Sequence, residues 1–469
     1  MQNLLGSVAL IAWPILAIYL FATKRLSLAI LWTLMAAQMA LPTGALIKFE
    51  MIPQFDKNSI PNLCVLIGCL VVAKRPLRIF NGFGLPELLI VCYLIGPIIT
   101  SQLNGDAVVA GDRVIPGATL YDALSSAENA FIFIIPFFVG RQFLRTDADA
   151  RDILVVLAMA GLVYSFPLLF EVRMSPTLQS DIYGFAATDF VMTARGGGYR
   201  PMAFMGSGLI ASFFMMTTVV AATALWRTRL QLFRLPPSGL SAYLGGVLIL
   251  CKSFGALLYG IVLIPMVKWT SSRVQMRVAV VLVSIALFYP MLRSFDLFPT
   301  QSLLQAISTV SEERKRSLDF RFSNEDKLLR RAFERPVFGW GRYGRSRVYN
   351  EDSGRDESVT DGLWILTIGA YGLFGFVAQF GLLGIGVFRA AAALKLSKPI
   401  NGAIFLSTIA LIVAANIVEM IPNSGLLPWS WLLCGSLLGQ SEALRVRAMQ
   451  KRRQVNMNVD VASHSALKS

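Results

Sequence analysis

Apolar stretches of membrane-spanning length recur along the whole chain, separated by polar segments. A helix needs about 20 consecutive apolar residues to cross a bilayer. The pattern therefore predicts an all-α fold, a polytopic transmembrane helical bundle of about 12 to 13 spans. The predicted spans are 3–22, 26–46, 58–73, 85–103, 122–140, 153–171, 203–226, 238–251, 254–268, 277–292, 362–388, 402–420 and 425–439.

Basic residues gather in alternate loops between these spans, which indicates the sidedness of the chain. The positive-inside rule assigns the face that carries them to the cytoplasm. The N-terminus is then outside, and 104–121, 171–202 and 293–361 are the outer segments. The basic groups are Lys24/Arg25, Lys74/Arg75/Arg78, Arg141/Arg145/Arg151, Arg227/Arg229/Arg234, Lys268/Arg273/Arg277, Arg389/Lys395/Lys398 and the tail Arg445 to Arg453.

The stretch 238–268 has strongly basic flanks on both sides, so an even number of crossings must lie between them. It is too long for one span and too short for two full ones. We therefore expect a short hairpin whose turn, around Lys252, is recessed into the outer leaflet. A lysine at that depth is costly unless it is paired or faces a polar cavity.

One long polar block interrupts the apolar pattern and divides the chain into four regions. The predicted regions are an N-terminal bundle over 1–292, a large periplasmic loop over 293–361, C-terminal spans over 362–439 and a disordered cytoplasmic basic tail over 440–469. Between Lys327 and Arg347 the block holds seven Lys/Arg and a single acid, Glu334. Such a segment is suited to holding an anionic ligand at the bilayer surface.

The block contains a predicted amphipathic helix from Asn324 to about Glu334, lying near the membrane surface. Ser323 or Asn324 is a suitable N-cap, and Pro336 ends the helix. Two interpretations stay open for it. Its arginines either only snorkel at the interface or bind a ligand.

The residues after this helix favour the second interpretation. Glycines at 339, 341 and 344 allow close backbone approach, arginine binds phosphate oxygens in a bidentate fork, and Trp340 and Tyr343 offer flat faces for sugar rings. The glycine-flanked arginines of 195–200 form a second candidate, as an entry loop or a phosphate site. The candidate diphosphate and sugar contacts are Arg195, Arg200, Lys252, Arg321, Arg330, Arg331, Arg335, Trp340 and Tyr343, and the candidate acids or bases are Glu325, Glu334 and Asp361.

Composition excludes several other chemistries. The chain of 469 residues is 55% hydrophobic and 15% charged, with mean hydropathy +0.60 and formal net charge +15. Its five cysteines lie in apolar stretches, and its one histidine, His464, lies in the tail, so we expect no disulfide, no metal site and no cofactor. Asp147-Ala-Asp149 resembles a metal-binding motif but falls in a short cytoplasmic loop. Nucleic-acid binding by the basic tail is not expected, because such tails meet anionic lipid.

The chain resembles the O-antigen ligase and polymerase-like membrane proteins (Wzy/WaaL type) over roughly residues 190–390. The resemblance rests on an ordered set of motifs with matching sidedness. These motifs are Arg195 with the following glycines, the Lys252-Ser-Phe-Gly255 turn, Arg321, Ala332, Pro336-Val-Phe-Gly-Trp-Gly341, Asp361-Gly-Leu-Trp364 and Gly369-Ala-Tyr-Gly372.

The resemblance implies a GT-C-like, metal-independent glycosyltransferase of the bacterial inner membrane, with its active site facing the periplasm. Its donor would be an oligosaccharide on undecaprenyl diphosphate. Ligases of this type usually carry a histidine near the start of the span after the large loop, whereas this chain has Asp361 there. That difference favours an exopolysaccharide polymerase that extends the non-reducing end of another lipid-linked repeat unit. Chain-length regulator and export proteins are further candidate partners.

Two alternatives stay open. One is an O-antigen-type ligase that moves the glycan to another acceptor. The other is a lipid-linked oligosaccharide flippase or anion transporter, which should show paired broken helices in two halves of the chain.

Overall fold

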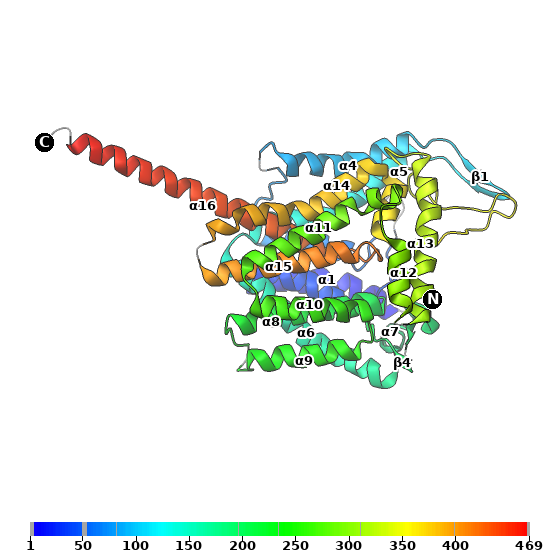
Figure 1. Cartoon of the computed structure of the whole chain (residues 1–469), viewed down its shortest axis with the longest axis horizontal. Coiled ribbons are helices and arrows are strands. Elements are labelled where there is room, and N and C mark those ends of the chain that lie inside the picture. Colours follow the sequence, from blue (N-terminus) through cyan, green and yellow to red (C-terminus); the bar gives the residue numbers. More distant parts are fainter. Residues whose placement is uncertain are drawn as a thin grey trace.

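Long helices run side by side through the molecule, and the shorter elements gather at one of its ends (Figure 1). The computed structural model describes residues 4–48, 54–80, 82–195, 197–232, 234–309, 311–397 and 399–466.

The apolar stretches of the sequence form the helices of the bundle. These are α1 (Leu4–Thr23), α2 (Leu26–Ala40), α3 (Ser59–Ile67) continued by a π-turn (Gly68–Val72), α4 (Leu85–Gln102), α5 (Leu120–Phe143), α6 (Asp147–Met174), α8 (Gly208–Arg227), α9 (Pro237–Leu250), α10 (Phe254–Trp269), α11 (Ser272–Ser294), α14 (Leu363–Ala393) with the 3-10 turn Leu394–Leu396, α15 (Ile400–Glu419) and α16 (Pro428–Ala466).

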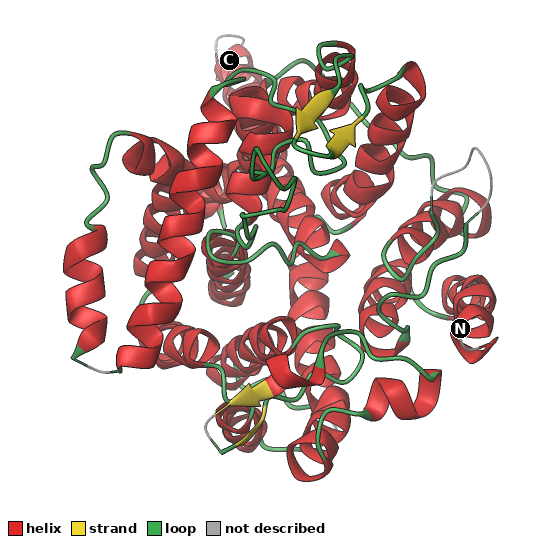
Figure 2. Ribbon diagram, turned by 90° about the vertical axis from the view of Figure 1, so that its right-hand side faces the viewer, coloured by secondary structure: helices red, strands yellow, loops and turns green. Residues whose placement is uncertain are grey.

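The remaining elements belong to the three long segments predicted to lie outside. They are β1 (Val108–Ala110) and β2 (Arg113–Ile115), α7 (Leu178–Tyr183), a 3-10 turn (Phe190–Thr193), β3 (Ala194–Arg195) and β4 (Gly198–Tyr199), α12 (Thr300–Ser308) and α13 (Glu312–Phe333). Each strand pair is an antiparallel hairpin, with Ala110 opposite Arg113 and Arg195 opposite Gly198. We call the end of the bundle that carries these elements the loop end. Figure 2 looks at it and shows the loops and both hairpins over the helix ends.

Eight of the helices among the described residues are long and apolar enough to cross a membrane, and α2, α3 with its π-turn, α9 and α10 are shorter apolar helices. The protein is therefore an all-α, multi-pass membrane protein. Every predicted span coincides with a helix. The predicted hairpin over 238–268 is present as α9 and α10, joined by a turn at 251–253.

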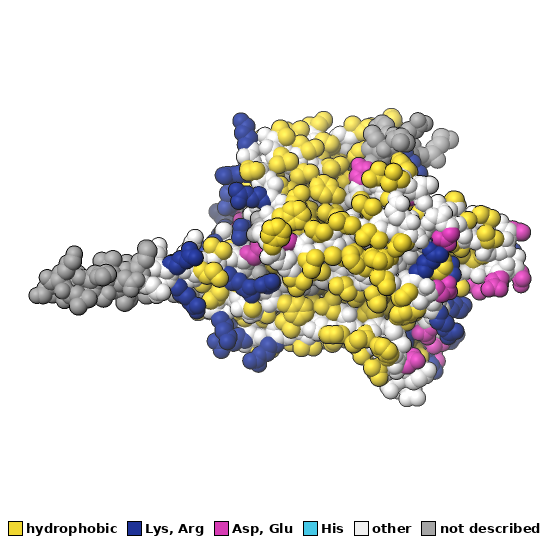
Figure 3. Space-filling model, turned by 90° about the horizontal axis from the view of Figure 1, so that it is seen from above, with side chains coloured by type: hydrophobic (Ala, Val, Ile, Leu, Met, Phe, Trp, Pro, Cys, Tyr) yellow, Lys and Arg dark blue, Asp and Glu magenta, His cyan; other side chains and the backbone are white. Residues whose placement is uncertain are grey.

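The two ends of the molecule differ in the charged residues that they carry. Figure 3 shows an apolar belt around the middle, mostly Lys and Arg at the end that carries α16, and mixed charges at the loop end. We call the Lys/Arg-rich end the basic end. Arg445 of α16 lies there, and Arg141, Arg145 and Arg389 line the same cavity as Arg445.

The tail differs from its prediction. The sequence pattern predicts disorder from residue 440, but α16 continues through Ala466. Between Gln440 and Asn456 the chain has no Gly or Pro and consists mostly of good helix formers, above all Arg, Gln and Ala. These residues have high helix propensity, so nothing in the local sequence ends the helix that begins in the bundle.

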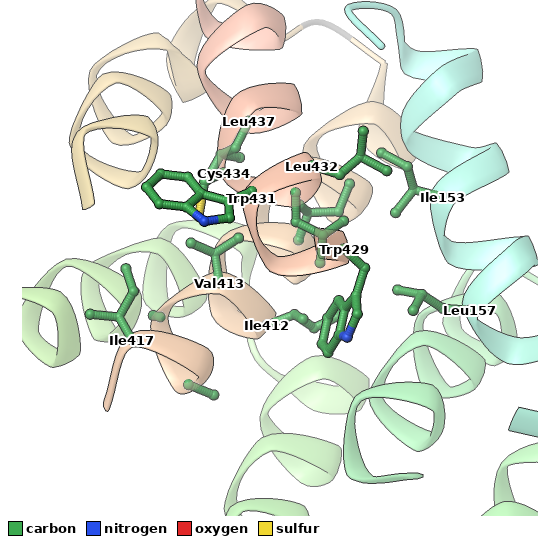
Figure 4. Packing of buried hydrophobic residues seen from close by; sticks show 14 of the residues in the cluster. Ile153, Leu157, Ile412, Val413, Ile417, Trp429, Trp431, Leu432, Cys434 and Leu437 are labelled. Carbon is green, nitrogen blue, oxygen red and sulfur yellow. The ribbon is translucent and has the colours of Figure 1, made fainter. Parts of the chain in front are cut away.

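The interior of the bundle is packed around α8 and α15, whose apolar windows are 83% buried, against 28% for α1 at the periphery. Figure 4 shows the start of α16 in this core. Trp429 and Trp431 lie among Ile412 and Val413 of α15, with Leu157 of α6 also in view.

Glycines bring α5 and α16 into close contact. A Cβ at Gly435 would lie 2.0 Å from the Phe137 carbonyl oxygen, and one at Gly439 would lie 2.1 Å from the Arg141 carbonyl oxygen. Gly140 of α5 faces the Leu432 carbonyl in the same way. The Gly435-x-x-x-Gly439 spacing is typical of helix pairs in membranes, where small residues let backbones approach.

Candidate functional site at the loop end

A cavity of about 300 Å³ lies at the loop end where α13 covers the ends of α10, α11, α14 and α15. Most of its lining is apolar, including Ile285, Phe298 and Leu303. The polar groups that face it are Tyr259, Tyr289, Arg321, Glu325 and Asp361. Three of the sequence candidates, Arg321, Glu325 and Asp361, therefore share one cavity.

Helical spacing on α13 explains why these side chains point the same way. Arg321, Glu325 and Leu328 are four and three residues apart, so they lie on one face of the helix and all line the cavity. Phe322 and Leu329, which flank that face, are buried against the bundle.

The helix is longer than predicted. It begins at Glu312, not at Ser323 or Asn324, because Glu312 and Glu313 favour its first turn and neither Gly nor Pro interrupts 311–335. Asn324 is buried inside the helix instead of capping it. Its amide donates to the Phe320 carbonyl, and its Oδ1 accepts from the Val359 backbone N–H. Asn324 thus ties the helix to the segment that leads into α14.

Arg321 forms the centre of the site. Its Nε lies 3.5 Å from Asp361 Oδ2, and both side chains are partly exposed, at 30% and 41%. Glu419, the last residue of α15, lies within electrostatic reach of Arg321 and is hydrogen-bonded to Tyr259 and Asn423. The arginine therefore lies near two carboxylates, of which Asp361 lines the cavity, and it remains accessible to a ligand.

Glu325 is held more rigidly than Asp361. It is buried, accepts a hydrogen bond of 2.9 Å from Tyr289 Oη and lies 3.3 Å from Arg293 Nε. Burial raises the pKa of the Glu325 carboxyl, and Tyr289 and Arg293 partly oppose that rise. Arg293 also pairs with Asp326 at 2.5 Å. These contacts make Glu325 an anchor between α11 and α13.

A second cluster joins two further sequence candidates. Lys252 is exposed in the α9–α10 turn, with φ +50°, and a Cβ at Gly198 would lie 2.2 Å from its Nζ. Arg200 follows β4 and packs along Gly208. The glycine loop and the hairpin turn are thus neighbours, although about 50 residues of sequence separate them. The backbone of Arg195 lies in β3, but its side chain lies outside the described part of the chain.

Helix α13 connects the two clusters. The guanidinium of Arg314 lies 3.9 Å from the ring centroid of Phe254, two residues after Lys252. Arg321 lies seven residues further along the helix, a rise of about 10 Å. The cationic groups of both clusters therefore lie along one edge of the loop end.

The arginines at the end of α13 have structural partners. Arg331 and Arg335 lie over the Trp340 ring, 3.4 Å and 4.2 Å from its centroid. Trp340 is buried and donates from Nε1 to the Arg331 carbonyl oxygen. Arg331 pairs with the exposed Glu334 at 2.5 Å. These predicted ligands of the diphosphate instead hold the loop together, and none of them lines the cavity beside Arg321.

Arg335 and the buried Arg345 attach this part of the loop to residues 104–116, which belong to the predicted outer segment 104–121. Arg335 Nη2 lies 2.8 Å from Asp106 Oδ2, and Arg345 donates to the Pro116 carbonyl at 2.9 Å. Arg335 holds the pKa of the Asp106 carboxyl below its usual range. The segment 104–116 is therefore part of the loop end's framework.

Arg330 and Tyr343, the remaining candidates, are exposed and do not line the cavity beside Arg321. Tyr343 borders a smaller cavity with Arg342 and Asp122.

The glycine motif of the loop docks onto a break in α14. At Gly372 the helix has φ +64° and ψ −167°, so its ladder of hydrogen bonds is interrupted. The segment 336–341 fills the break: Trp340 N–H and Gly341 N–H donate to the carbonyls of residues 369 and 370, and the Pro336 and Val337 carbonyls accept from residues 373 and 374. A Cβ at Gly339 would lie 2.6 Å from backbone atoms of α14. These glycines allow backbone to approach backbone, not a ligand as predicted.

Sequence reasoning missed Arg293, Tyr259, Tyr289 and Glu419. For Glu419 a signal existed, since an acid at the end of an apolar stretch of span length is expensive and usually functional. Tyr259 and Tyr289 lie within predicted apolar spans and Arg293 directly follows one, and these positions become neighbours only when the helices pack.

Within the described residues, no group of three or more His, Cys, Asp or Glu side chains is placed to hold a metal ion. Searched against protein-family models, the chain matches none, and a comparison with curated protein sequences gives no significant match.

Proposed function

We propose that this membrane protein is a metal-independent glycosyltransferase of the polymerase type. It transfers a glycan from undecaprenyl diphosphate to the non-reducing end of another lipid-linked repeat unit, at the periplasmic face of the bacterial inner membrane. The observation that best supports this proposal is the accessible Arg321–Asp361 pair in the wall of a mainly apolar cavity. Lys252 lies further along the same edge of the loop end. The resemblance to Wzy/WaaL-type proteins supports the same proposal, and a GT-C-like arrangement goes with it.

The chemistry assigns each group a role. The acceptor hydroxyl oxygen attacks the anomeric carbon of the donor sugar, and the bond between that carbon and the diphosphate oxygen breaks. The diphosphate leaves with the electron pair, and Arg321 binds its growing negative charge. Lys252, which lies beyond Arg314 on the same edge, contacts another anionic group of the lipid-linked substrates. Asp361 takes the proton of the acceptor hydroxyl. Glu325 holds α13 against α11, so that Arg321 keeps its orientation.

A flippase or transporter is supported less well. Transporters bind substrate at paired broken helices, and α14 is broken at Gly372. However, the backbone of 336–341 occupies that break. A cavity of about 380 Å³ does border the break, with Ala370, Tyr371 and Gly375 in its lining. Among the described helices, however, α14 is not matched by a second helix with such a break in the other half of the chain.

The test compares Arg321→Lys with Arg330→Lys. Both residues lie on α13, but Arg330 is exposed and does not line the cavity. Lysine keeps the charge and loses the bidentate fork. Arg321→Lys should lower the polymerisation rate by about 30- to 1000-fold, which corresponds to roughly 2–4 kcal/mol of lost transition-state stabilisation. Arg330→Lys should leave the rate unchanged.

The measurement is polymer yield and length in cells, together with the lipid-linked repeat unit, at matched amounts of membrane-inserted protein. The proposal requires repeat units to accumulate on the outer face in the Arg321 variant while polymer disappears. Accumulation on the inner face would indicate a flippase instead. Normal polymer in the Arg321 variant, or equal loss in both variants, would overturn the proposed site.

A further inference from the structure

A second charged cavity lies at the basic end, far from Arg321. Its volume is about 370 Å³, and it is lined by the ends of α4, α5, α14 and α16. Four arginines and two carboxylates line it, which leaves a net charge of plus two if all six are ionised. These residues are Arg141, Arg145, Arg389, Arg445, Glu87 and Glu442.

Arg141 forms the buried floor of this cavity. It is only 4% exposed, and its Nη2 lies 2.6 Å from both Glu87 Oε1 and Glu442 Oε1. Its other terminal nitrogen, Nη1, has no hydrogen-bond partner among the described residues. Both acids of the cavity are therefore engaged by one arginine, and that arginine still has a free donor.

Among the described residues, no carboxylate pairs with the other three arginines. Arg145 donates weakly to the Gly439 carbonyl, at 3.4 Å, and within the described ranges Arg389 and Arg445 form no ion pair. All three are partly buried. Cations held together in a partly buried space repel one another, so a bound anion would stabilise this arrangement.

The rim of the cavity distinguishes a lipid from a free anion. Phe83, which precedes α4, is fully exposed, and Val446 of α16 is exposed as well. Charged groups at the floor and apolar side chains at the rim match a phosphate attached to acyl chains. Basic pockets between transmembrane helices on the cytoplasmic side bind anionic lipid headgroups in this way.

We propose that this cavity binds the phosphate of an anionic phospholipid from the leaflet at the basic end. Arg389 and Arg445 contact the phosphate oxygens from two sides, above the buried Arg141. The lipid thereby ties α14 to the glycine-packed pair of α5 and α16. This site is independent of the glycosyltransferase proposal, and its test does not use that activity.

The test uses the double variant Arg389→Gln/Arg445→Gln. The matched control is Arg447→Gln/Arg452→Gln, which removes the same charge from exposed positions of α16 that do not line the cavity. Each purified protein in neutral detergent is titrated with phosphatidylglycerol, phosphatidylcholine or inorganic phosphate. Binding is followed by native mass spectrometry and by the shift in melting temperature.

Phosphatidylglycerol should bind the parent protein and the control and raise their melting temperatures. The cavity variant should bind it at least about tenfold more weakly, as expected for the loss of two charge-assisted contacts. Equal binding by both double variants, or equal binding of phosphatidylcholine, would overturn the site. A full shift with inorganic phosphate alone would overturn the lipid as its ligand.

Discussion

Replacing Gly339 by alanine tests whether the glycine motif of the loop is a docking element. The new Cβ would lie 2.6 Å from backbone atoms of Ala370, Tyr371 and Gly372. Because these atoms belong to α14 and no flexible side chain can move aside, the loop must withdraw. Gly341→Ala is the matched control. Gly341 also has positive φ, +83°, but its Cβ would meet nothing closer than 3.9 Å.

The contacts of the two glycines determine how much more Gly339→Ala should destabilise the protein than Gly341→Ala. An alanine forced into the left-handed region costs about 1–2 kcal/mol, and both variants carry this cost. Gly339→Ala adds overpacking of about 1–3 kcal/mol, and loss of even two of the four docking hydrogen bonds adds about 1–3 kcal/mol. We therefore expect about 1–2 kcal/mol of destabilisation for Gly341→Ala and about 3–8 kcal/mol for Gly339→Ala.

The assay is the melting temperature of each purified variant in detergent, taken from the fraction that stays monodisperse after heating. Limited proteolysis of the loop at 25 °C provides a second measurement. Gly339→Ala should melt well below Gly341→Ala, and its loop should be cut faster. Equal melting and equal cutting of the two variants would refute the docking interpretation.

Three further predictions concern sidedness, the turn and pH. In a cysteine-free background, cysteines at the exposed positions Ser353 and Gln450 should be labelled from outside and inside the cell respectively, and the reverse pattern would contradict the assigned topology. Lys252→Ala should abolish polymer in membranes that contain normal amounts of protein while Lys252→Arg retains part of it, and normal polymer in Lys252→Ala would remove this residue from the site. Arg335 lowers the pKa of the Asp106 carboxyl below its usual 3.8. The ion pair therefore stabilises the folded protein fully above pH 3.8, and this stabilisation is lost as the pH falls through the lowered pKa of Asp106. The fall in melting temperature between about pH 6 and pH 3 should thus be smaller in Asp106→Asn, and an unchanged pH dependence would contradict this.

The sequence by itself determined the class of the protein and the course of its helices. Apolar length is a local property, so each predicted span coincides with a helix, and even the hairpin around Lys252 followed from counting basic flanks. It also included Arg321 and Asp361 among its candidates, Arg321 as a cation of the long polar block and Asp361 as an acid at the start of the next apolar span.

Only the tertiary structure decided which of the many loop arginines face the cavity. Arginine has the same local signature whether it stacks on Trp340, as Arg331 does, or lines a cavity, as Arg321 does. The glycine motif was misjudged for a related reason. A glycine permits close approach, but what approaches Gly339 is the backbone of α14, and that partner exists only once residues 336–341 and 369–374 have come together in space.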